Sequence, residues 1–305
     1  MILLTGGTGA VGRAIATELV KRGEKLVLIT RTKANVEFPG DMLLEEGNIS
    51  DTSFLDAIFK KYSFETIIHC AWDGVTGAFR NSPGQINNFI ATNNLLELAG
   101  ANKVKTFIGL GSQAEYGVYN ERISEDFLPQ PQSLYGLYKL SCGLAGKILA
   151  EQYGFRFAWL RLFAAYGPND NQGFLIPYAL KSFLCNTSPN LSSCEQSWDY
   201  LFLPDLSKIV GEIVTSKHAF NSIYNLSSGK AQSLKSIIML LKQITQSPIE
   251  PNFGAIQNRS DLIFLEGSNE KLFHDFQIKG LTDINKGLSL TVDWYKKNLT
   301  DYEGF

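Results

Sequence analysis

The chain has 305 residues, of which 44% are hydrophobic and 19% are charged. This composition supports a sizeable buried core and excludes a wholly disordered chain. With 28 basic and 30 acidic side chains the formal net charge is −2, so no basic excess favours nucleic acid as a partner.

Short apolar runs alternate with helical patterns in the first half of the chain. Strands are predicted, in chain order, at residues 2–5, 26–29, 66–70, 106–110 and 157–161. Helices are predicted between them at residues 11–22, 86–98 and 138–153. Strands that are buried on both faces and joined by helices are typical of a doubly wound parallel sheet. The predicted fold class is therefore α/β, with a Rossmann sheet.

The pattern loosens after residue 166, where short elements mix with polar stretches such as residues 185–196. We predict a Rossmann domain over residues 1–166. A smaller, mixed α/β region is predicted over residues 167–305, with some of its segments returning to the Rossmann domain.

The opening residues 1–7 lack the basic and long apolar segments of a signal peptide, and no apolar run is long enough to predict a membrane span. Four cysteines without a CxxC pattern predict free thiols in a reducing compartment. Three scattered histidines do not predict a metal site. We therefore expect a cytoplasmic protein that binds neither metal nor membrane.

A glycine-rich turn follows the first predicted strand. Gly6, Gly9 and Gly12 fit the pattern G-x-x-G-x-x-G between a strand and a helix. Glycines there permit a tight turn and let a pyrophosphate approach the backbone at the positive end of the helix dipole. The turn predicts a dinucleotide site formed by Gly6, Thr8, Gly9, Ala10, Val11 and Gly12.

The end of the second strand indicates which dinucleotide binds. Residues 29–33 contain no carboxylate for a ribose 2′-hydroxyl, but they include Arg31 and Lys33. Arg31 could pair with a 2′-phosphate, assisted by Arg13. The sequence therefore predicts NADP(H) as the preferred cofactor of residues 1–166, with NAD(H) possible. A solvated basic loop is the alternative explanation of the same residues.

A tyrosine and a lysine lie four residues apart on one predicted helix. Tyr135 and Lys139 would share a helix face, and a nearby ammonium group would lower the phenol pKa toward a usable range. Ser112 follows the fourth predicted strand, where its hydroxyl could hydrogen-bond a reacting carbonyl oxygen. These three side chains predict acid/base chemistry at a carbonyl.

These motifs together resemble the extended short-chain dehydrogenase/reductase family, in particular its NAD(P)-dependent epimerase/dehydratase group acting on nucleotide sugars. The resemblance runs nearly from end to end. The segments that carry it are residues 5–12, 47–51, 67–71, 88–97, 112–117, 135–139, 161–168, 224–229 and 291–295.

The resemblance implies roles for individual residues. Tyr135 would be the catalytic acid/base, Lys139 would bind the nicotinamide ribose, and Ser112 would polarise the carbonyl. Further cofactor contacts are implied for Asn48, Ile49, Cys70, Ala71, Trp72 and Asn88. Related enzymes form dimers through a four-helix bundle, which implies a homodimer through residues 86–98 and 134–153.

The chain also departs from the family pattern. Gln113 and Ala114 stand where the dehydratases carry an Asp-Glu pair, which disfavours dehydration. Ala164 replaces an asparagine that contacts the sugar nucleotide, and Trp198 replaces an arginine. Nucleotide binding must then be rebuilt, with Arg259 on the diphosphate and Trp198 stacked on a base. Substrate contacts are expected from Ser112, Gln113, Trp198 and Arg259.

The favoured function is an NADPH-dependent ketoreductase that acts on a nucleotide-diphosphate keto sugar. Residues 109–117 look most like reductases that make CDP- or dTDP-linked 6-deoxyhexoses, which points to C4 of a 4-keto-6-deoxyhexose. A nucleotide-sugar 4-epimerase with tightly bound NAD needs the same three catalytic side chains. A non-catalytic NADP(H)-sensing protein is a third alternative, although such proteins commonly lose the tyrosine or the lysine.

Overall fold

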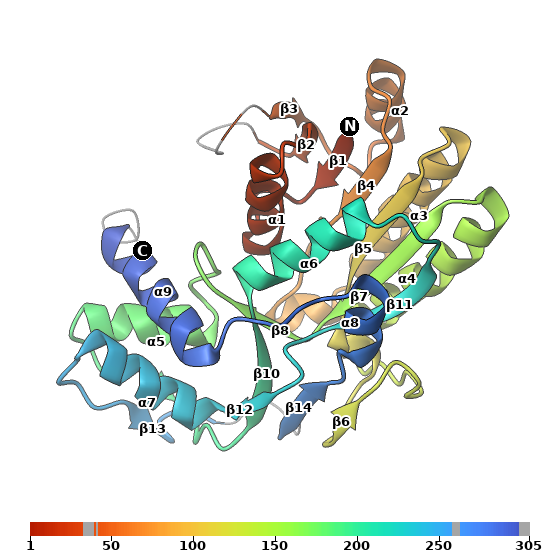
Figure 1. Ribbon diagram of the computed structural model, residues 1–305. Helices are drawn as coiled ribbons and strands as arrows, with labels where there is room; N and C mark the ends of the chain where they lie inside the picture. Colours follow the sequence, from red (N-terminus) through yellow and green to blue (C-terminus); the bar gives the residue numbers. More distant parts are fainter. Residues whose placement is uncertain (33–39, 41, 258–262, 299–305) are drawn as a thin grey trace.

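A computed structural model describes residues 1–32, 40, 42–257 and 263–298. A seven-stranded parallel sheet lies at its centre, in the order β11-β7-β5-β4-β1-β2-β3 (Figure 1). The strands are β1 (Ile2–Thr5), β2 (Leu26–Thr30), β3 (Leu43–Glu46), β4 (Thr66–His69), β5 (Thr106–Ser112), β7 (Arg156–Leu162) and β11 (Asn221–Leu226). The order reverses between β1 and β4, as in doubly wound folds.

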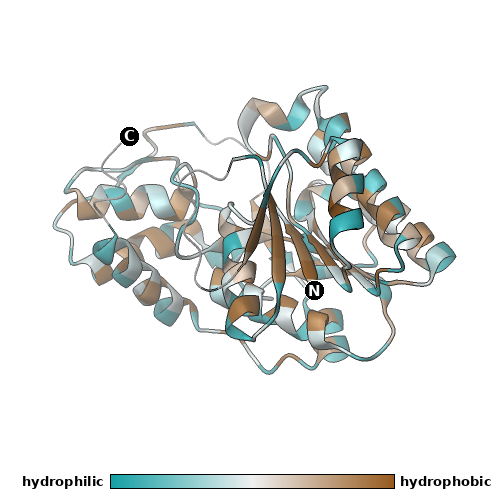
Figure 2. Cartoon of the chain, turned by 90° about the horizontal axis from the view of Figure 1, so that it is seen from above, coloured by the Kyte–Doolittle hydropathy of each residue, from teal (hydrophilic) through white to brown (hydrophobic). Residues whose placement is uncertain are grey.

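Helices cover both faces of this sheet. On β1, Ile2 and Leu4 point to one face and Leu3 to the other, and all three are buried. Figure 2 shows the apolar strands enclosed between helices whose outer faces are polar. One layer contains α1 (Ala10–Lys21), α6 (Leu203–Thr215) and α8 (Glu270–Phe276). The other layer contains α2 (Thr52–Lys61), α3 (Gln85–Ala101) and α4 (Leu134–Tyr153).

The predicted α/β Rossmann fold is confirmed, although several of its elements, among them β3 and α2, were not predicted. β3 is an edge strand whose sequence, Leu-Leu-Glu-Glu, is half-exposed and forms no apolar run. α2 begins after Asp51, whose carboxylate accepts hydrogen bonds from Ser53 N at 2.9 Å and Phe54 N at 3.1 Å. β11 comes from the second half of the chain and pairs with β7. The predicted boundary at residue 166 stays a prediction.

A smaller mixed sheet lies beside the Rossmann sheet. Its central strand, β10 (Ser197–Phe202), pairs with both parallel and antiparallel neighbours. The neighbours of β10 and the strand beyond them are β12 (Ala231–Ser233), β14 (Phe264–Gly267), β8 (Ala164–Tyr166) and β6 (Arg122–Ile123). The short strands β9 (Asn190–Leu191) and β13 (Asn252–Phe253) pair separately.

Three helices pack beside this second sheet around a separate apolar cluster. They are α5 (Leu175–Leu184), α7 (Leu234–Thr245) and α9 (Ile284–Lys297). Two short 3₁₀ helices, η1 (Gly77–Asn81) and η2 (Gln113–Glu115), follow β4 and β5. Within the described residues, none of the helices combines the length and apolar character needed to cross a bilayer.

Candidate active site

Of the three motif glycines in the turn after β1, Gly9 alone has free space where a side chain would begin. Gly6 has a left-handed φ of +71°, and a Cβ there would lie 2.5 Å from Ala71 N. A Cβ at Gly12 would lie 2.2 Å from Gly6 O, so both glycines are required by the packing of the turn. At Gly9 the nearest atom would be Gly6 O at 3.6 Å, and no described side chain caps α1 there. This open backbone at the positive end of α1 fits the pyrophosphate of a dinucleotide.

The other predicted cofactor residues follow neighbouring strands. Because β1 to β4 are parallel, the segments that follow them meet at the carboxyl edge of the sheet. Ala10 and Val11 form the first turn of α1, after the exposed Thr8. The structure brings to this edge Thr8, Ala10, Val11, Arg31, Asn48, Ile49, Cys70, Ala71 and Trp72.

Ser112 and Tyr135 converge at the carboxyl end of β5. Ser112 is the last residue of the strand, and Tyr135 lies in the first turn of α4. A Cβ at Gly136 would lie 2.3 Å from Ala114 O, so a glycine there lets α4 close against η2. The Ser112 side chain lies close enough to the Tyr135 phenol to lower its pKa. The two groups can therefore act on one substrate oxygen.

Lys139 lies one helical turn beyond Tyr135 and is buried. Its Nζ donates a hydrogen bond to Leu110 O and lies 3.9 Å from the centroid of the Trp72 ring. Burial lowers the pKa of Lys139 to about 8. The ammonium form still predominates at pH 7, but it is held less firmly than that of an exposed lysine.

Two opposing influences act on the phenol of Tyr135. Burial raises its pKa above the ordinary value, while the Ser112 side chain and the Arg80 guanidinium lower it. The Arg80 guanidinium carbon lies 4.8 Å from the centroid of the tyrosine ring. The sequence predicted that the Lys139 ammonium would lower this pKa. In the structure the cation that does so is Arg80, on η1.

The loop after β4 is tied to α3. Trp72 Nε1 donates to Gln85 Oε1 at 2.8 Å, and the Trp72 ring meets the Tyr135 ring edge-on at 6.0 Å between centroids. The amide of Asn88 accepts from Asp73 N and donates to Asp73 O, both at 3.0 Å. Asn88, predicted as a cofactor residue, therefore also fixes the loop beside the catalytic pair.

Arg31 pairs with a carboxylate across the edge of the sheet. Its Nη1 lies 3.0 Å from Asp73 Oδ1, and both side chains are about 70% exposed, at 70% and 72%. β2 and β4 flank β1, so this pair spans the end of β1 beside the glycine turn. A 2′-phosphate would compete with Asp73 for Arg31. Lys33 lies outside the described residues.

The predicted substrate residues are placed less completely. Gln113 and Ala114 form η2 directly after Ser112, so neither an acid nor a base stands at the positions that dehydration uses. Trp198, on β10, packs near Tyr200 with 6.4 Å between ring centroids. Its Nε1 is buried without an acceptor among the described residues. Arg259 lies outside the described part of the chain.

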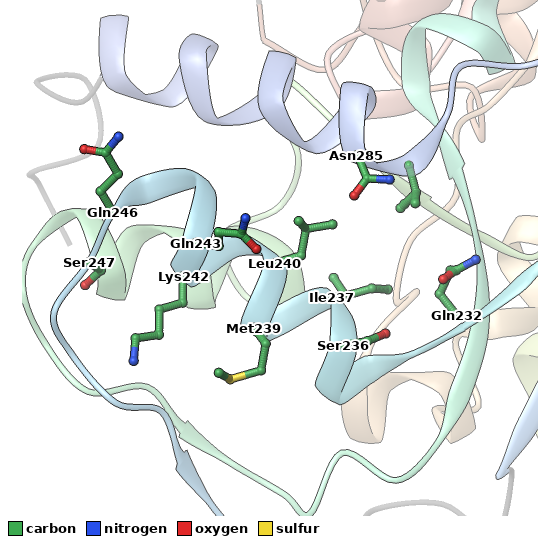
Figure 3. Close-up of a pocket in the computed structure, with 11 residues that line it drawn as sticks. Gln232, Ser236, Ile237, Met239, Leu240, Lys242, Gln243, Gln246, Ser247 and Asn285 are labelled. Carbon is green, nitrogen blue, oxygen red and sulfur yellow. The ribbon is translucent and has the colours of Figure 1, made fainter.

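A separate hollow of about 800 Å³ lies between α7 and α9, and none of the predicted site residues lines it. Figure 3 shows side chains of α7 turned toward Asn285 of α9. Its lining is Gln232, Ser236, Ile237, Met239, Leu240, Lys242, Gln243, Gln246, Ser247, Ile284 and Asn285. We therefore place the chemistry at the sheet edge, where the titratable groups converge.

Three residues of the site were missed by sequence reasoning. Arg80 and Gln85 lie in segments without a recognisable motif. Glu115 did carry a signal, because residues 112–115 read S-x-x-E, the pattern of a capping box. The structure forms that box: Glu115 Oε1 accepts from Ser112 N at 2.8 Å, and Ser112 Oγ accepts from Ala114 N at 3.2 Å.

Comparison with known proteins agrees with this geometry. A UDP-glucose 4-epimerase of Corynebacterium glutamicum is 28% identical over 88% of each chain. A CDP-abequose synthase of Salmonella muenchen is 25% identical over 94% of this chain and 95% of that protein. The crystal structure of Thermus thermophilus UDP-glucose 4-epimerase, a complex with NAD, superposes with a TM-score of 0.87 at 20% identity, covering 97% of this chain and 98% of that one.

The family profile described as "NAD dependent epimerase/dehydratase family" matches residues 2–227, which include the glycine turn, Ser112, Tyr135 and Lys139. Its relatives are catalytic nucleotide-sugar proteins. The chain therefore belongs to the NAD-dependent epimerase/dehydratase family and is an enzyme of the extended short-chain dehydrogenase/reductase type.

Proposed function

We propose that this protein is a nucleotide-sugar 4-epimerase that retains NAD. The observation that carries the proposal is the convergence of Ser112, Tyr135 and Lys139 in a chain 28% identical to a UDP-glucose 4-epimerase over 88% of both lengths. The backbone of the glycine turn would hold NAD, which would supply reversible hydride transfer at C4 of the sugar.

The protein side chains would handle the proton and the oxygen. Tyr135 takes the proton of the 4-hydroxyl and later returns it. The Arg80 guanidinium beside its ring favours the phenolate that the first step needs. Ser112 Oγ already accepts from Ala114 N, which leaves its O–H free to donate to the substrate oxygen. The ammonium group of Lys139, which is buried beside the Trp72 ring, adds a positive charge to the site.

A reductase is the second candidate, and a specific observation favours it. β2 ends without a carboxylate and is followed by Arg31, a pattern that suits NADP(H). The 25% identity with a CDP-abequose synthase extends over 94% of this chain. In this alternative, Tyr135 donates a proton while the 4-keto group of a nucleotide 6-deoxyhexose is reduced.

The dinucleotide that the purified protein carries separates the two candidates. An epimerase should release about one equivalent of NAD on denaturation, and should interconvert UDP-glucose and UDP-galactose without added cofactor. A protein that carries no dinucleotide, and that oxidises NADPH only with a nucleotide 4-keto-6-deoxyhexose, would replace the epimerase with the reductase. Formation of a 4-keto-6-deoxy sugar from a nucleotide hexose would contradict both, because Gln113 and Ala114 supply no acid for dehydration.

The substrate nucleotide would be held by residues beyond the Rossmann sheet. Trp198 offers an indole ring for stacking and an Nε1 donor without a partner among the described residues. Arg259 is proposed to bind the diphosphate. Trp198→Phe keeps an aromatic ring, although a smaller one, and removes the donor, so it should raise KM for UDP-glucose and leave the retained NAD unchanged.

We also propose a homodimer through α3 and α4. These adjacent helices carry a stripe of exposed apolar side chains: Ile86, Ile90, Leu144 and Ile148 are 42%, 49%, 49% and 66% exposed. Exposed apolar side chains on two adjacent helices favour association with a second copy. Ile148→Asp should convert the dimer into a monomer in sedimentation equilibrium. A monomeric wild-type protein would rule out the dimer.

A further inference from the structure

A buried carboxylate lies directly behind Ser112. Glu115 has 0% exposure, and each of its three hydrogen bonds comes from a different residue. Its Oε1 accepts from Ser112 N at 2.8 Å and from Trp159 Nε1 at 2.9 Å, and its Oε2 accepts from Arg161 Nε at 2.7 Å. Arg161 is only 2% exposed, so the charge pair is closed to water. A buried pair with this many donors holds its atoms in fixed positions.

The protein makes space for one of these donors with three glycines. A Cβ at Gly109 would lie 2.3 Å from the Trp159 ring, and a Cβ at Gly111 would lie 2.4 Å from its Nε1. A Cβ at Gly143, on α4, would lie 2.7 Å from Trp159 Cδ1. The indole therefore passes between β5 and α4 in a slot that only glycines leave open, and reaches Glu115 from β7.

The counter-charge is anchored from the opposite side. The Arg161 guanidinium carbon lies 4.3 Å from the centroid of the Tyr116 ring. Tyr116 OH donates to Asn225 Oδ1 on β11 at 2.7 Å. Arg161 and Asn225 lie on neighbouring strands, since β7 pairs with β11. β5, β7 and β11 thus contribute to holding the carboxylate of Glu115, which lies on η2. Of the groups involved, Ser112 alone belongs to the proposed catalytic set.

We propose that Glu115 is a positioning residue: held by Trp159 and Arg161, it fixes Ser112 at the end of β5 and keeps a negative charge behind the catalytic pair of α4. The inference rests on the proposed function, because it takes Ser112 and Tyr135 to act on the substrate oxygen. Ser112 N is the last backbone donor of β5, so the bond to Glu115 sets where the serine hydroxyl lies.

The charge of Glu115 also bears on when Tyr135 and Lys139 ionise. It raises the pKa values of both, acting with burial on Tyr135 and against burial on Lys139. The other titratable or charged groups that face this pair are Arg80, His69, Cys70 and Cys142. Removing the Glu115 charge should therefore lower the pH at which Tyr135 becomes a phenolate.

Glu115→Gln tests the proposal, since it keeps the shape and removes the charge. We expect kcat on the alkaline plateau to fall about tenfold, with KM for UDP-glucose changed less than about twofold, as for a lost transition-state contact. The ¹³Cζ resonance of Tyr135, assigned with Tyr135→Phe, should titrate about half a pH unit or more lower. Trp159→Phe keeps the charge and removes one donor, so kcat should fall while the titration of Tyr135 shifts less.

Asp205→Asn is the matched control. Asp205 is a buried carboxylate on α6 that accepts from Thr282 N at 2.6 Å and Thr282 Oγ1 at 3.0 Å. It should lower the melting temperature without moving kcat or the Tyr135 titration. If Glu115→Gln behaves like this control, Glu115 is only structural and the proposal is overturned. If Glu115→Gln fails to fold, the double variant Glu115→Gln with Arg161→Met, which removes both charges, takes its place.

The titration also separates this proposal from the proposed function. It is measured on the free protein and requires no substrate. A wild type without epimerase activity, but with the shifted Tyr135 titration in Glu115→Gln, would overturn the assigned reaction and support the role of Glu115. If the wild type has epimerase activity but Glu115→Gln leaves the Tyr135 titration unshifted, the assigned reaction would be supported and the role of Glu115 would be overturned.

Discussion

The two regions that meet at the site treat their buried polar groups differently. Around β5, Glu115 receives three hydrogen bonds, and His69 is bonded at both ring nitrogens, at 2.8 Å and 2.9 Å. Beyond residue 166, Asp170 Oδ2, Gln196 Oε1 and Trp198 Nε1 are buried without a partner in the described residues. Among the described residues, Glu115 and His69, near the carboxyl ends of β5 and β4, thus have partners within the protein, whereas three buried polar atoms beyond residue 166 do not.

This difference fits a division of labour between the regions. A buried polar atom without a partner costs about 1–3 kcal/mol, so a chain keeps such atoms where a ligand or an ordered water supplies the missing partner. Groups that act on the transition state must instead be fixed before the substrate arrives. Thr106 Oγ1 is also unpaired, but it lies at the start of β5, away from the carboxyl edge.

Tyr135→Phe should have the largest effect. The variant keeps the ring against Trp72 and removes the transferable proton, so kcat should fall about 10²–10⁴-fold while the dinucleotide stays bound. Tyr138→Phe, three residues along the same helix, is the control and should leave kcat nearly unchanged. Turnover of Tyr135→Phe at the wild-type rate would show that the proton comes from another group.

Gly9→Ala should separate cofactor binding from folding. A methyl group at Gly9 meets no protein atom closer than 3.6 Å, so the melting temperature should stay near that of the wild type. The methyl projects from the backbone that we assign to the pyrophosphate, and the affinity for NADH should fall about 10–100-fold. Gly12→Ala, whose Cβ would lie 2.2 Å from Gly6 O, should instead destabilise the fold. Unchanged NADH affinity in Gly9→Ala would contradict the assignment of the pyrophosphate to this turn.

Sequence reasoning succeeded where the physical signal is local. The first strand, the glycine turn and the helix that carries Lys139 all follow from neighbouring residues, and the structure contains each of them; α4 begins at Leu134, four residues before the predicted helix at 138–153, and so also includes Tyr135. β3 was not predicted, because an edge strand needs no apolar run. The central strands were predicted, because they are buried on both faces and therefore form apolar runs.

The network around Glu115 depends on distant parts of the chain, so it could not be predicted in the same way. Its donors Trp159 and Arg161 lie 44 and 46 residues further on. The capping-box spacing of residues 112–115 marked the carboxylate, but not its ion pair. Helical spacing predicts a lysine beside Tyr135, but it could not predict the second cation, Arg80, which reaches the ring from η1.

Asp170→Asn tests the region beyond residue 166 through the pH dependence of stability. Burial raises the pKa of Asp170 to about 7, from an unfolded value near 4. Between these two values the unfolded chain binds fewer protons than the native chain, so the free energy of unfolding falls as pH rises, and it levels off above pH 7. Asp170→Asn should remove this dependence of stability on pH. At pH 8 the variant should be more stable than the wild type by about 2 kcal/mol. This is less than the full free energy of the pKa shift, because the new amide still lacks a hydrogen-bond partner.

Chemical denaturation of Asp170→Asn and the wild type at pH 5 and pH 8 measures this difference. At pH 5 the wild-type carboxyl is protonated in the native state, so the two proteins should differ little. Asp283→Asn is the control, because Asp283 is a capping carboxylate on the surface whose pKa is lowered by hydrogen bonds with Asn285. That control should lose stability at pH 8. A gain that is equal at both pH values would contradict the assigned titration.

The smallest effect is expected at Arg31, where the comparison bears on the cofactor. Arg31 and Asp73 are both largely exposed, so their ion pair contributes at most about 1 kcal/mol. For a protein that retains NAD, Arg31→Ala should leave NADH affinity unchanged and weaken NADPH by less than about tenfold. Asp73→Asn should strengthen NADPH by up to about fivefold, because Arg31 is released for a 2′-phosphate.

Calorimetric titration with NADH and NADPH measures these affinities. Arg122→Ala is the control. Arg122 lies on β6, which is not part of the Rossmann sheet, and pairs with Glu270 of α8 at 3.0 Å. A loss of NADPH affinity well beyond tenfold in Arg31→Ala, together with NADPH preference in the wild type, would mean that Arg31 is a dedicated phosphate ligand rather than the partner of Asp73. The carboxyl edge of β2 would then have been selected for a cofactor drawn from the NADPH pool. In that case Ser112, Tyr135 and Lys139 would serve a reductase.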